Sequence, residues 1–163
     1  MCIAPSFFRQ VIVVPLPYQN ASSGANARAE IVKILRRFGC ESVGFMDEFD
    51  TGVVILAFKW RGRQIQLQAS GQGWASAYLK EFPYNNKRRG TQKQYEEKAL
   101  AQGMMAVNSI LRDWVKGQVT AIETGILSFE HVFMPYIMMP DGRQLIEHIE
   151  DRKLLPPPEE KYC

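Results

Sequence analysis

The segment from Thr91 to Gly125 has the hydrophobic pattern of one long helix. Thr91 and Gln94 form a capping-box pattern at its start, and Gly125 is a natural stop. Such a helix would be roughly 50 Å long at about 1.5 Å per residue, and we expect the other elements to pack against it. Its apolar residues recur at helical spacing: Leu100, Met104, Val107, Leu111, Trp114, Val115, Val119, Ile122 and Ile126.

Two shorter segments also have helical spacing. From about Ala25 to Phe38, apolar side chains follow an i, i+3, i+4, i+7 pattern, and Gly39 is the expected terminator. A stripe of aromatic residues from Trp74 to Phe82 predicts a short helix that Pro83 ends.

The region between these helices has the pattern of a three-stranded meander. Residues 42–49 alternate, and the β-branched, apolar run 53–60 follows a turn at Asp50-Thr-Gly52. A two-residue turn at Arg61-Gly62 would put every apolar residue of the hairpin on one face, and a slip of one residue would exchange the faces. The pairs this turn predicts are Trp60 with Arg63, Phe58 with Ile65, Leu56 with Leu67 and Val54 with Ala69, which leaves Lys59, Gln64, Gln66 and Gln68 on the polar face.

Two further elements complete the predicted fold. Residues 11–14 are a β-branched run that predicts a first strand, and residues 136–146 predict a small hairpin on an Asp-Gly turn. We therefore predict an α+β fold in the order β-α-β-β-β-α-α: an antiparallel sheet of about four strands, packed on one face by helices including one long helix, with a small C-terminal hairpin. Residues 1–153 would form a single domain and residues 154–163 a flexible tail rich in proline and glutamate.

Composition places the chain among ordinary globular domains. It has 163 residues, 46% of them hydrophobic, and a net charge of +3, which permits an anionic partner. Three cysteines at unrelated spacings, Cys2, Cys40 and Cys163, favour reduced thiols in a cytosolic compartment. We expect no signal peptide, because the opening residues lack a basic segment before a long apolar core. Since the longest apolar run, Val53 to Phe58, is too short to cross a bilayer, we expect a cytoplasmic protein with no membrane contact.

Acidic residues near the first strand connection offer two kinds of chemistry. Asp50-Thr-Gly52 matches the aspartic-protease tripeptide, but that reaction needs two carboxylates, and a plain turn is the simpler interpretation. Asp47, Glu48 and Asp50 could hold a hard cation, or form a solvated acidic turn. His131 and His148 are the only histidines, and no nucleophile elbow or phosphate loop occurs. Nothing here indicates an enzyme, with Asp50 the only specific candidate, and we expect no catalytic residue, metal site or cofactor.

Basic residues gather in two places. Lys87, Arg88, Arg89 and Lys93 flank the start of the long helix, where free amides and the helix dipole favour an anion. A bound phosphate would remove the conflict between these cations and the dipole, and Glu96 and Glu97 offer partial relief without a ligand. The second group, at the tip of the predicted hairpin, consists of Lys59, Trp60, Arg61 and Arg63.

The hairpin-tip group combines cations with an aromatic ring. Proteins use this combination to neutralise phosphates and to stack on bases. The alternative is structural: Trp60 caps the core and Arg63 stacks on it as a cation–π pair. The two basic groups together are the predicted nucleic-acid-binding residues.

The stretch from Leu111 to Glu130, followed by Pro140-Asp-Gly-Arg143, resembles small uncharacterised proteins of tailed bacteriophages and prophages. The resemblance extends back through the hairpin residues 58–63. It implies a phage context, where small basic cytosolic proteins often act on DNA or on host factors. Separately, the order helix, three strands, helix is similar to that of double-stranded-RNA-binding domains, from which the helix at 74–82 and the missing lysine motif depart.

Two hypotheses for function follow. The first is a non-enzymatic phage accessory protein that binds nucleic acid in replication or recombination, in the host cytoplasm. The alternative is a protein-binding inhibitor of a host or anti-phage defence factor, with self-association as a further option. Its surface would be the polar strand face or a methionine-rich patch, which could equally be plastic core: Met104, Met105, Met134, Met138 and Met139.

Overall fold

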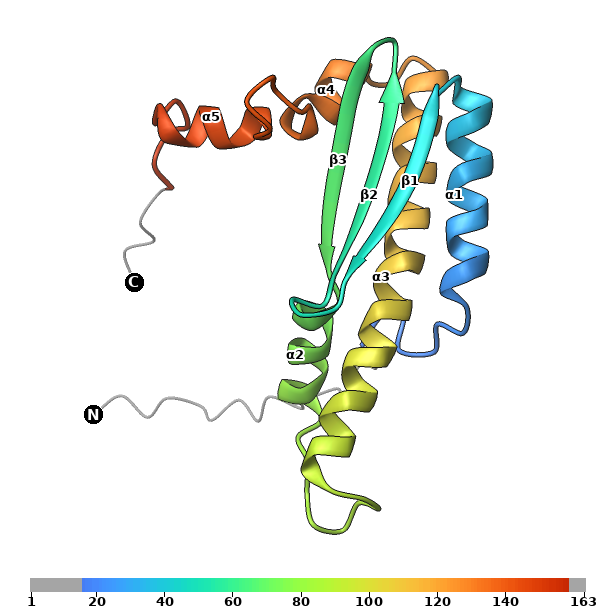
Figure 1. The fold of residues 1–163 in the computed structure, drawn as a ribbon, viewed down its shortest axis with the longest axis vertical. Coiled ribbons are helices and arrows are strands. Elements are labelled where there is room, and N and C mark those ends of the chain that lie inside the picture. Colours follow the sequence, from blue (N-terminus) through green and yellow to red (C-terminus); the bar gives the residue numbers. More distant parts are fainter. Residues whose placement is uncertain (1–15, 159–163) are drawn as a thin grey trace, which may run out of the picture.

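A computed structural model describes residues 16–158 of the chain (Figure 1). Its elements are α1 (Gly24–Phe38), β1 (Ser42–Glu48), β2 (Val53–Trp60), β3 (Arg63–Ser70), α2 (Gly71–Glu81), α3 (Gln92–Glu123), α4 (Phe129–Phe133), a 3₁₀ turn η1 (Met134–Tyr136) and α5 (Leu145–Asp151). The α+β prediction with one long helix is confirmed. Within residues 16–158 the sheet has three antiparallel strands in the order β1-β2-β3, and the strand predicted at 11–14 lies outside the described residues.

The β2–β3 hairpin has the register that the hydrophobic pattern predicts. Phe58 pairs with Ile65 and Leu56 with Leu67. Arg61 and Gly62, in the turn, have φ values of 48° and 77°. Positive φ at both central residues is typical of a type I′ turn, whose twist matches that of the strands. The turn and the buried face therefore specify the same pairing.

Local capping explains where the helices begin and end. The Thr91 and Gln94 side chains form the predicted capping box at the start of α3, and Gly125 follows its end with φ of 75°. In α2 the structure differs from the prediction, because the helix begins at Gly71. The Ser70 hydroxyl accepts the Gly73 N–H at 2.8 Å, so Gly71 and Gly73 form the first turn of the helix, ahead of the predicted start at Trp74.

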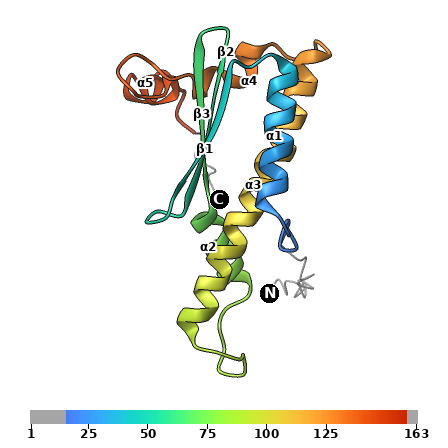
Figure 2. The same cartoon turned by 45° about the vertical axis from the view of Figure 1, so that its right-hand side comes forward.

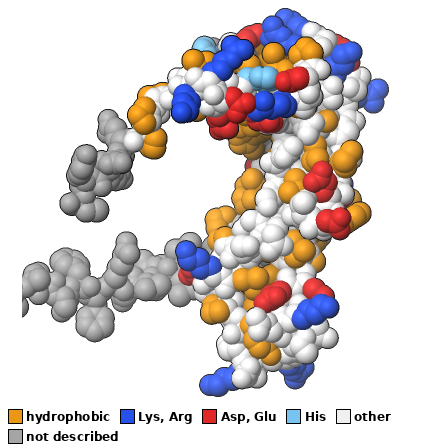
Figure 3. Space-filling model, turned by 60° about the vertical axis from the view of Figure 1, so that its left-hand side comes forward, with side chains coloured by type: hydrophobic (Ala, Val, Ile, Leu, Met, Phe, Trp, Pro, Cys, Tyr) orange, Lys and Arg blue, Asp and Glu red, His pale blue; other side chains and the backbone are white. Residues whose placement is uncertain are grey.

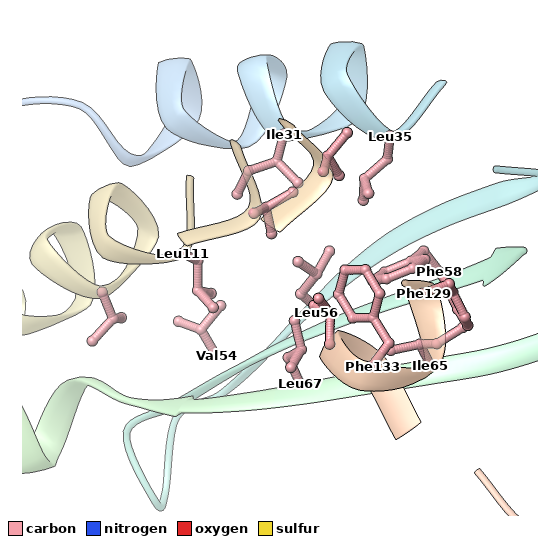
Figure 4. Close-up of a cluster of buried hydrophobic side chains, with 14 residues drawn as sticks. Ile31, Leu35, Val54, Leu56, Phe58, Ile65, Leu67, Leu111, Phe129 and Phe133 are labelled. Atoms are coloured by element: carbon pink, nitrogen blue, oxygen red, sulfur yellow. The ribbon is translucent and has the colours of Figure 1, made fainter. Parts of the chain in front are cut away.

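The sheet and helices form two layers. Viewed along the sheet, α1 and α3 lie on one side of it, and no helix of residues 16–158 covers the opposite face over most of its length (Figure 2). Buried residues of β2, β3, α1 and α3 meet between the layers, and α4 closes one end with Phe129 and Phe133 (Figure 4). Val54, Leu56, Ile65, Val115 and Val119 are among the side chains with no exposed surface.

The predicted C-terminal hairpin is present only as a short pairing around the Asp141-Gly142 turn, in which the Met139 N–H donates to the Arg143 carbonyl and the Leu145 N–H to the Ile137 carbonyl. Met138 and Gln144 form a single bridge pair without strands, and α5 starts at Leu145, where the second arm was expected. The η1 turn and the N-cap of α5 at Gln144 leave few residues free to extend the ladder. Instead, the Met138 N–H donates to the Gln64 carbonyl at 2.8 Å, and the segment covers the outer edge of β3. Residues 154–158 are exposed and form no helix or strand.

Candidate nucleic-acid interface

The two predicted basic groups lie at opposite ends of the molecule. The β2–β3 turn stands beside the C-terminal end of α3, and the loop before Thr91 lies at the other end of that helix (Figure 1). Because α3 has 32 residues, about 48 Å at about 1.5 Å per residue separate them. The structure does not bring the eight predicted residues into one site, and each group has to be considered by itself.

At the hairpin tip, the Trp60 ring is already in contact with its neighbours. Phe38 and Phe129 stack on it, with ring centroids 5.4 and 4.0 Å away. The Arg61 guanidinium lies 4.5 Å from its centroid. The structural alternative is therefore correct for Trp60, but the cation on the ring is Arg61 and not Arg63. Little of the ring is left for a nucleic-acid base, and phosphate contact is the chemistry that this end retains.

Two of the three hairpin-tip cations have carboxylate partners. Lys59 Nζ lies 3.3 Å from Glu41, which also accepts the Gly62 N–H at 2.9 Å. These two donors, the Gly62 amide first, lower the pKa of Glu41. Arg63 donates to Glu130 at 2.8 Å and lowers the pKa of that carboxyl. Both pairs are exposed, where such bonds contribute little stability, so a phosphate could exchange with either carboxylate.

A hollow of about 720 Å³ opens beside the hairpin tip. Phe38, Trp60 and Phe129 contribute apolar walls, and Arg61 and Arg63 line it together with Arg37 from the last turn of α1. Arg37 pairs with Glu123 at 3.2 Å in an exposed contact. Sequence reasoning missed Arg37 as a site residue, although it lies off the apolar stripe of its helix. We define the hairpin-tip surface as Arg37, Lys59, Arg61 and Arg63.

At the other end, the helix-start surface consists of Lys87, Arg88, Arg89 and Lys93. All four side chains are exposed. Among residues 16–158, Lys93 alone of these has a carboxylate within 4.0 Å, a pair with Glu97 at that limit. The predicted partial relief by neighbouring acids is therefore slight, since Glu96 instead accepts a hydrogen bond from Gln92. The capping box satisfies the amides of Thr91 and Gln94, which reduces what the helix N-terminus itself offers an anion and leaves most of the attraction to the side chains.

Aromatic residues support the helix-start surface. Arg88 lies 4.7 Å above the Tyr95 ring, and the Tyr84 hydroxyl donates to the Gly90 carbonyl at 2.9 Å. On α2, Tyr78 contacts both Trp74 and Phe82 at ring-centroid distances of 5.5 and 5.1 Å. The Tyr95 hydroxyl donates to the Phe82 carbonyl at 2.7 Å, which joins this predicted aromatic stripe to the start of α3. These contacts hold the loop in place and leave its charges exposed.

The acidic residues do not gather. Asp47 accepts two hydrogen bonds from Arg28, Glu48 accepts one from Thr51 at 3.0 Å, and Asp50 is an exposed turn residue. No group of three potential metal ligands occurs among residues 16–158. Cys40 is half-buried, and this desolvation raises the pKa of its thiol to about 11, which disfavours the reactive thiolate.

The methionine-rich patch is divided by the fold. Met104 packs beside Gly71 at one end of β3, whereas Met138 pairs with Gln64 at the other end. The open sheet face includes Met46, with 60% of its surface exposed. Phe49, in the adjoining turn, is 85% exposed and lines a hollow on the helix side of the sheet with Arg28 and Met104. None of the described helices is both long and apolar enough to span a membrane.

Comparison of the chain with models of protein families, with curated proteins and with solved structures finds no match.

Proposed function

We propose that the protein binds nucleic acid without catalysing a reaction, in the replication or recombination setting that its resemblance to bacteriophage proteins implies. The observation that carries the proposal is the helix-start surface. Lys87, Arg88 and Arg89 are exposed and have no carboxylate partner among residues 16–158. Uncompensated, clustered cations attract a polyanion, because each phosphate contact releases condensed counterions.

The hairpin-tip surface supports the same proposal through a different arrangement. Arg61 lies on the Trp60 ring with no carboxylate partner in the described part of the chain, and Arg37 and Arg63 stand around the same hollow. Guanidinium groups suit phosphate because they can donate two parallel hydrogen bonds. Because the Trp60 ring is covered, we expect this end to contact the phosphate backbone of the nucleic acid and not to distinguish base sequences.

The test is fluorescence anisotropy with labelled single- and double-stranded DNA and RNA. Between about 50 and 200 mM salt, we expect a plot of the logarithm of the association constant against the logarithm of the salt concentration to have a slope of about −3 for duplex DNA. Each of three to four phosphate contacts contributes roughly −0.9 to this slope. Reversing the charges in Arg88→Glu/Arg89→Glu should weaken binding at least about tenfold and reduce the slope by about 2. Anisotropy that rises with the same midpoint at every salt concentration would refute phosphate binding.

The matched control is Arg152→Glu/Lys153→Glu. These two residues are exposed near the end of α5, away from both basic surfaces (Figure 1), and the variant changes the net charge by the same amount. We expect it to bind nearly as well as the unaltered protein. An equal loss of affinity in both variants would indicate dependence on net charge, and the helix-start assignment would be wrong.

A protein partner is the second candidate, favoured by the open face of the sheet. Met46 lies on this face with 60% of its surface exposed, in one row of paired residues with the exposed Gln68. Large exposed apolar side chains are typical of contact surfaces. On this proposal, the protein inhibits a host or defence factor. The two candidates separate in one experiment: a protein that binds no nucleic acid at low salt, but forms a stoichiometric complex lost in Met46→Ser, would support inhibition.

A further inference from the structure

The chain carries two basic surfaces that cannot approach each other. The helix-start surface precedes Thr91, and the hairpin-tip surface lies beyond the C-terminal half of α3 (Figure 1). Between them α3 is one uninterrupted helix of 32 residues, about 48 Å long at about 1.5 Å per residue. Its inward side chains belong to the core, so it cannot fold back on itself.

Contacts fix the hairpin tip to the far end of α3. Trp60 stacks on Phe129, five residues beyond Thr124. Arg37 pairs with Glu123 in the last turn of α3, and Arg63 pairs with Glu130 in α4. The separation of the two surfaces is therefore a property of the packed domain, and motion of a single loop would not remove it.

On the face drawn in Figure 3, the surface between the two ends does not form a continuous basic track. Basic side chains lie near both ends of the molecule in this view, and acidic side chains also lie between them. Exposed side chains along α3 include the acidic Glu96, Glu97 and Asp113 as well as Lys98 and Lys116, so the charges there are mixed. A phosphate backbone laid along the whole helix would pass these carboxylates. At the two ends, by contrast, Arg61 on one side and Lys87, Arg88 and Arg89 on the other have no carboxylate partner among residues 16–158.

We infer that one molecule binds two separate nucleic-acid segments, one at each end of α3, and so bridges them. This inference rests on the proposed function. It goes further than the proposed function. A protein with a single binding surface, or with one continuous track along α3, would also bind nucleic acid, but it would not hold two short duplexes at once. Bridging brings a second segment to a high effective concentration without a second protein molecule.

A short duplex separates these arrangements. Eight G·C-rich base pairs are about 27 Å long at about 3.4 Å per base pair. That length is less than the span of α3 even after the reach of two arginine side chains. One such duplex cannot occupy both surfaces, so the number bound per protein molecule counts the surfaces directly.

The experiment is native mass spectrometry of the full chain with excess eight-base-pair duplex, because it resolves one protein with two duplexes from a dimer with two duplexes. We expect the first species. Two matched variants each remove one surface: Arg37→Gln/Arg61→Gln and Arg88→Gln/Arg89→Gln. Each should weaken the second association at least about tenfold and leave one duplex bound. Arg152→Gln/Lys153→Gln should keep both, and melting curves confirm that each variant is folded.

Each other outcome has a defined meaning. Saturation at one duplex, abolished by one of the two variants alone, would overturn bridging and leave the proposed function intact. A dimer with two duplexes, in the absence of the one-to-two species, would assign bridging to the dimer and overturn the inference. Two duplexes retained in either end variant would also overturn it, since the second site would lie elsewhere. Failure of both short and long nucleic acids to bind would overturn both proposals.

Discussion

Arg28 joins three elements of the fold through one guanidinium group. Both terminal nitrogens donate to Asp47 on β1, and Nε donates to the Asn108 side chain of α3 at 2.8 Å. The group also lies 5.1 Å from the centroid of the Phe45 ring. Asp47 can therefore lie as a charged residue on the inward face of β1, because α1 places Arg28 beside it. The alternating pattern of β1 alone does not predict this pair.

Removing this charge should cost stability. We expect Asp47→Asn to lower the free energy of unfolding in urea by about 1 to 2 kcal/mol, because a hydrogen-bonded, half-buried arginine loses its charged acceptor. Asp50→Asn makes the same chemical change at an exposed turn position and should alter stability by less than about 0.5 kcal/mol. Equal effects of the two substitutions would show that the Arg28 pair contributes nothing beyond net charge.

At the scale of elements, α2 and α3 meet through backbone. A Cβ atom at Gly103 would overlap the carbonyl oxygen of Gly71, and Ala75 and Ala99 are buried in the same helix pair. The first turn of α2 can therefore lie directly against α3, which turns the chain at the end of β3. Glycine is required at position 103 because the backbones of α2 and α3 approach each other closely there, and not because of its φ angle.

Two glycines of the same helix provide a matched test. Gly103→Ala should lower the free energy of unfolding by at least about 2 kcal/mol, because neither backbone can yield without separating the helices. At Gly117 an added Cβ meets nothing within 4 Å. Gly117→Ala should therefore raise stability by about 0.5 to 1 kcal/mol through helix propensity. Thermal and urea unfolding of both variants measures the difference, and a stable Gly103→Ala protein would contradict the close contact.

At the scale of the whole molecule, the C-terminal segment is an arm on the two-layer domain. No residue of α5 is buried, and the segment before it is held to β3 by a few hydrogen bonds, including Gln144 Nε2 to the Gln66 carbonyl. Its own ion pairs, Arg143 with Glu147 and with Asp151, are exposed. Such contacts bind the arm far less tightly than the core binds α3.

Hydrogen exchange should record this difference. We expect the amides of α5 to exchange at least about a hundredfold faster than those of residues 106–119 in α3, because the arm can open while the core stays folded. Exchange at the same rate in both segments would mean that the arm unfolds only with the whole domain. The β2 and β3 amides serve as the internal reference for global unfolding.

The sequence alone determined the parts of the fold that depend on neighbours along the chain. Capping residues and apolar spacing are local, so the pattern predicted α1, α3 and the Arg61-Gly62 hairpin register correctly. The two basic groups could also be identified from the sequence, because the residues of each group lie close together along the chain. The sequence could not predict that Arg37 lies beside the hairpin-tip residues, because it precedes Lys59 by more than twenty residues.

Only the tertiary structure decided what those groups face and how far apart they stand. Whether Trp60 was open to a base depended on Phe38 and Phe129, which come from opposite sides of it in sequence. The methionines that seemed one patch lie at opposite ends of β3. The distance between the basic surfaces depended on packing the hairpin against the far end of α3. Periodicity specifies which face of an element is buried, but the partner that buries it is chosen by the fit of distant segments.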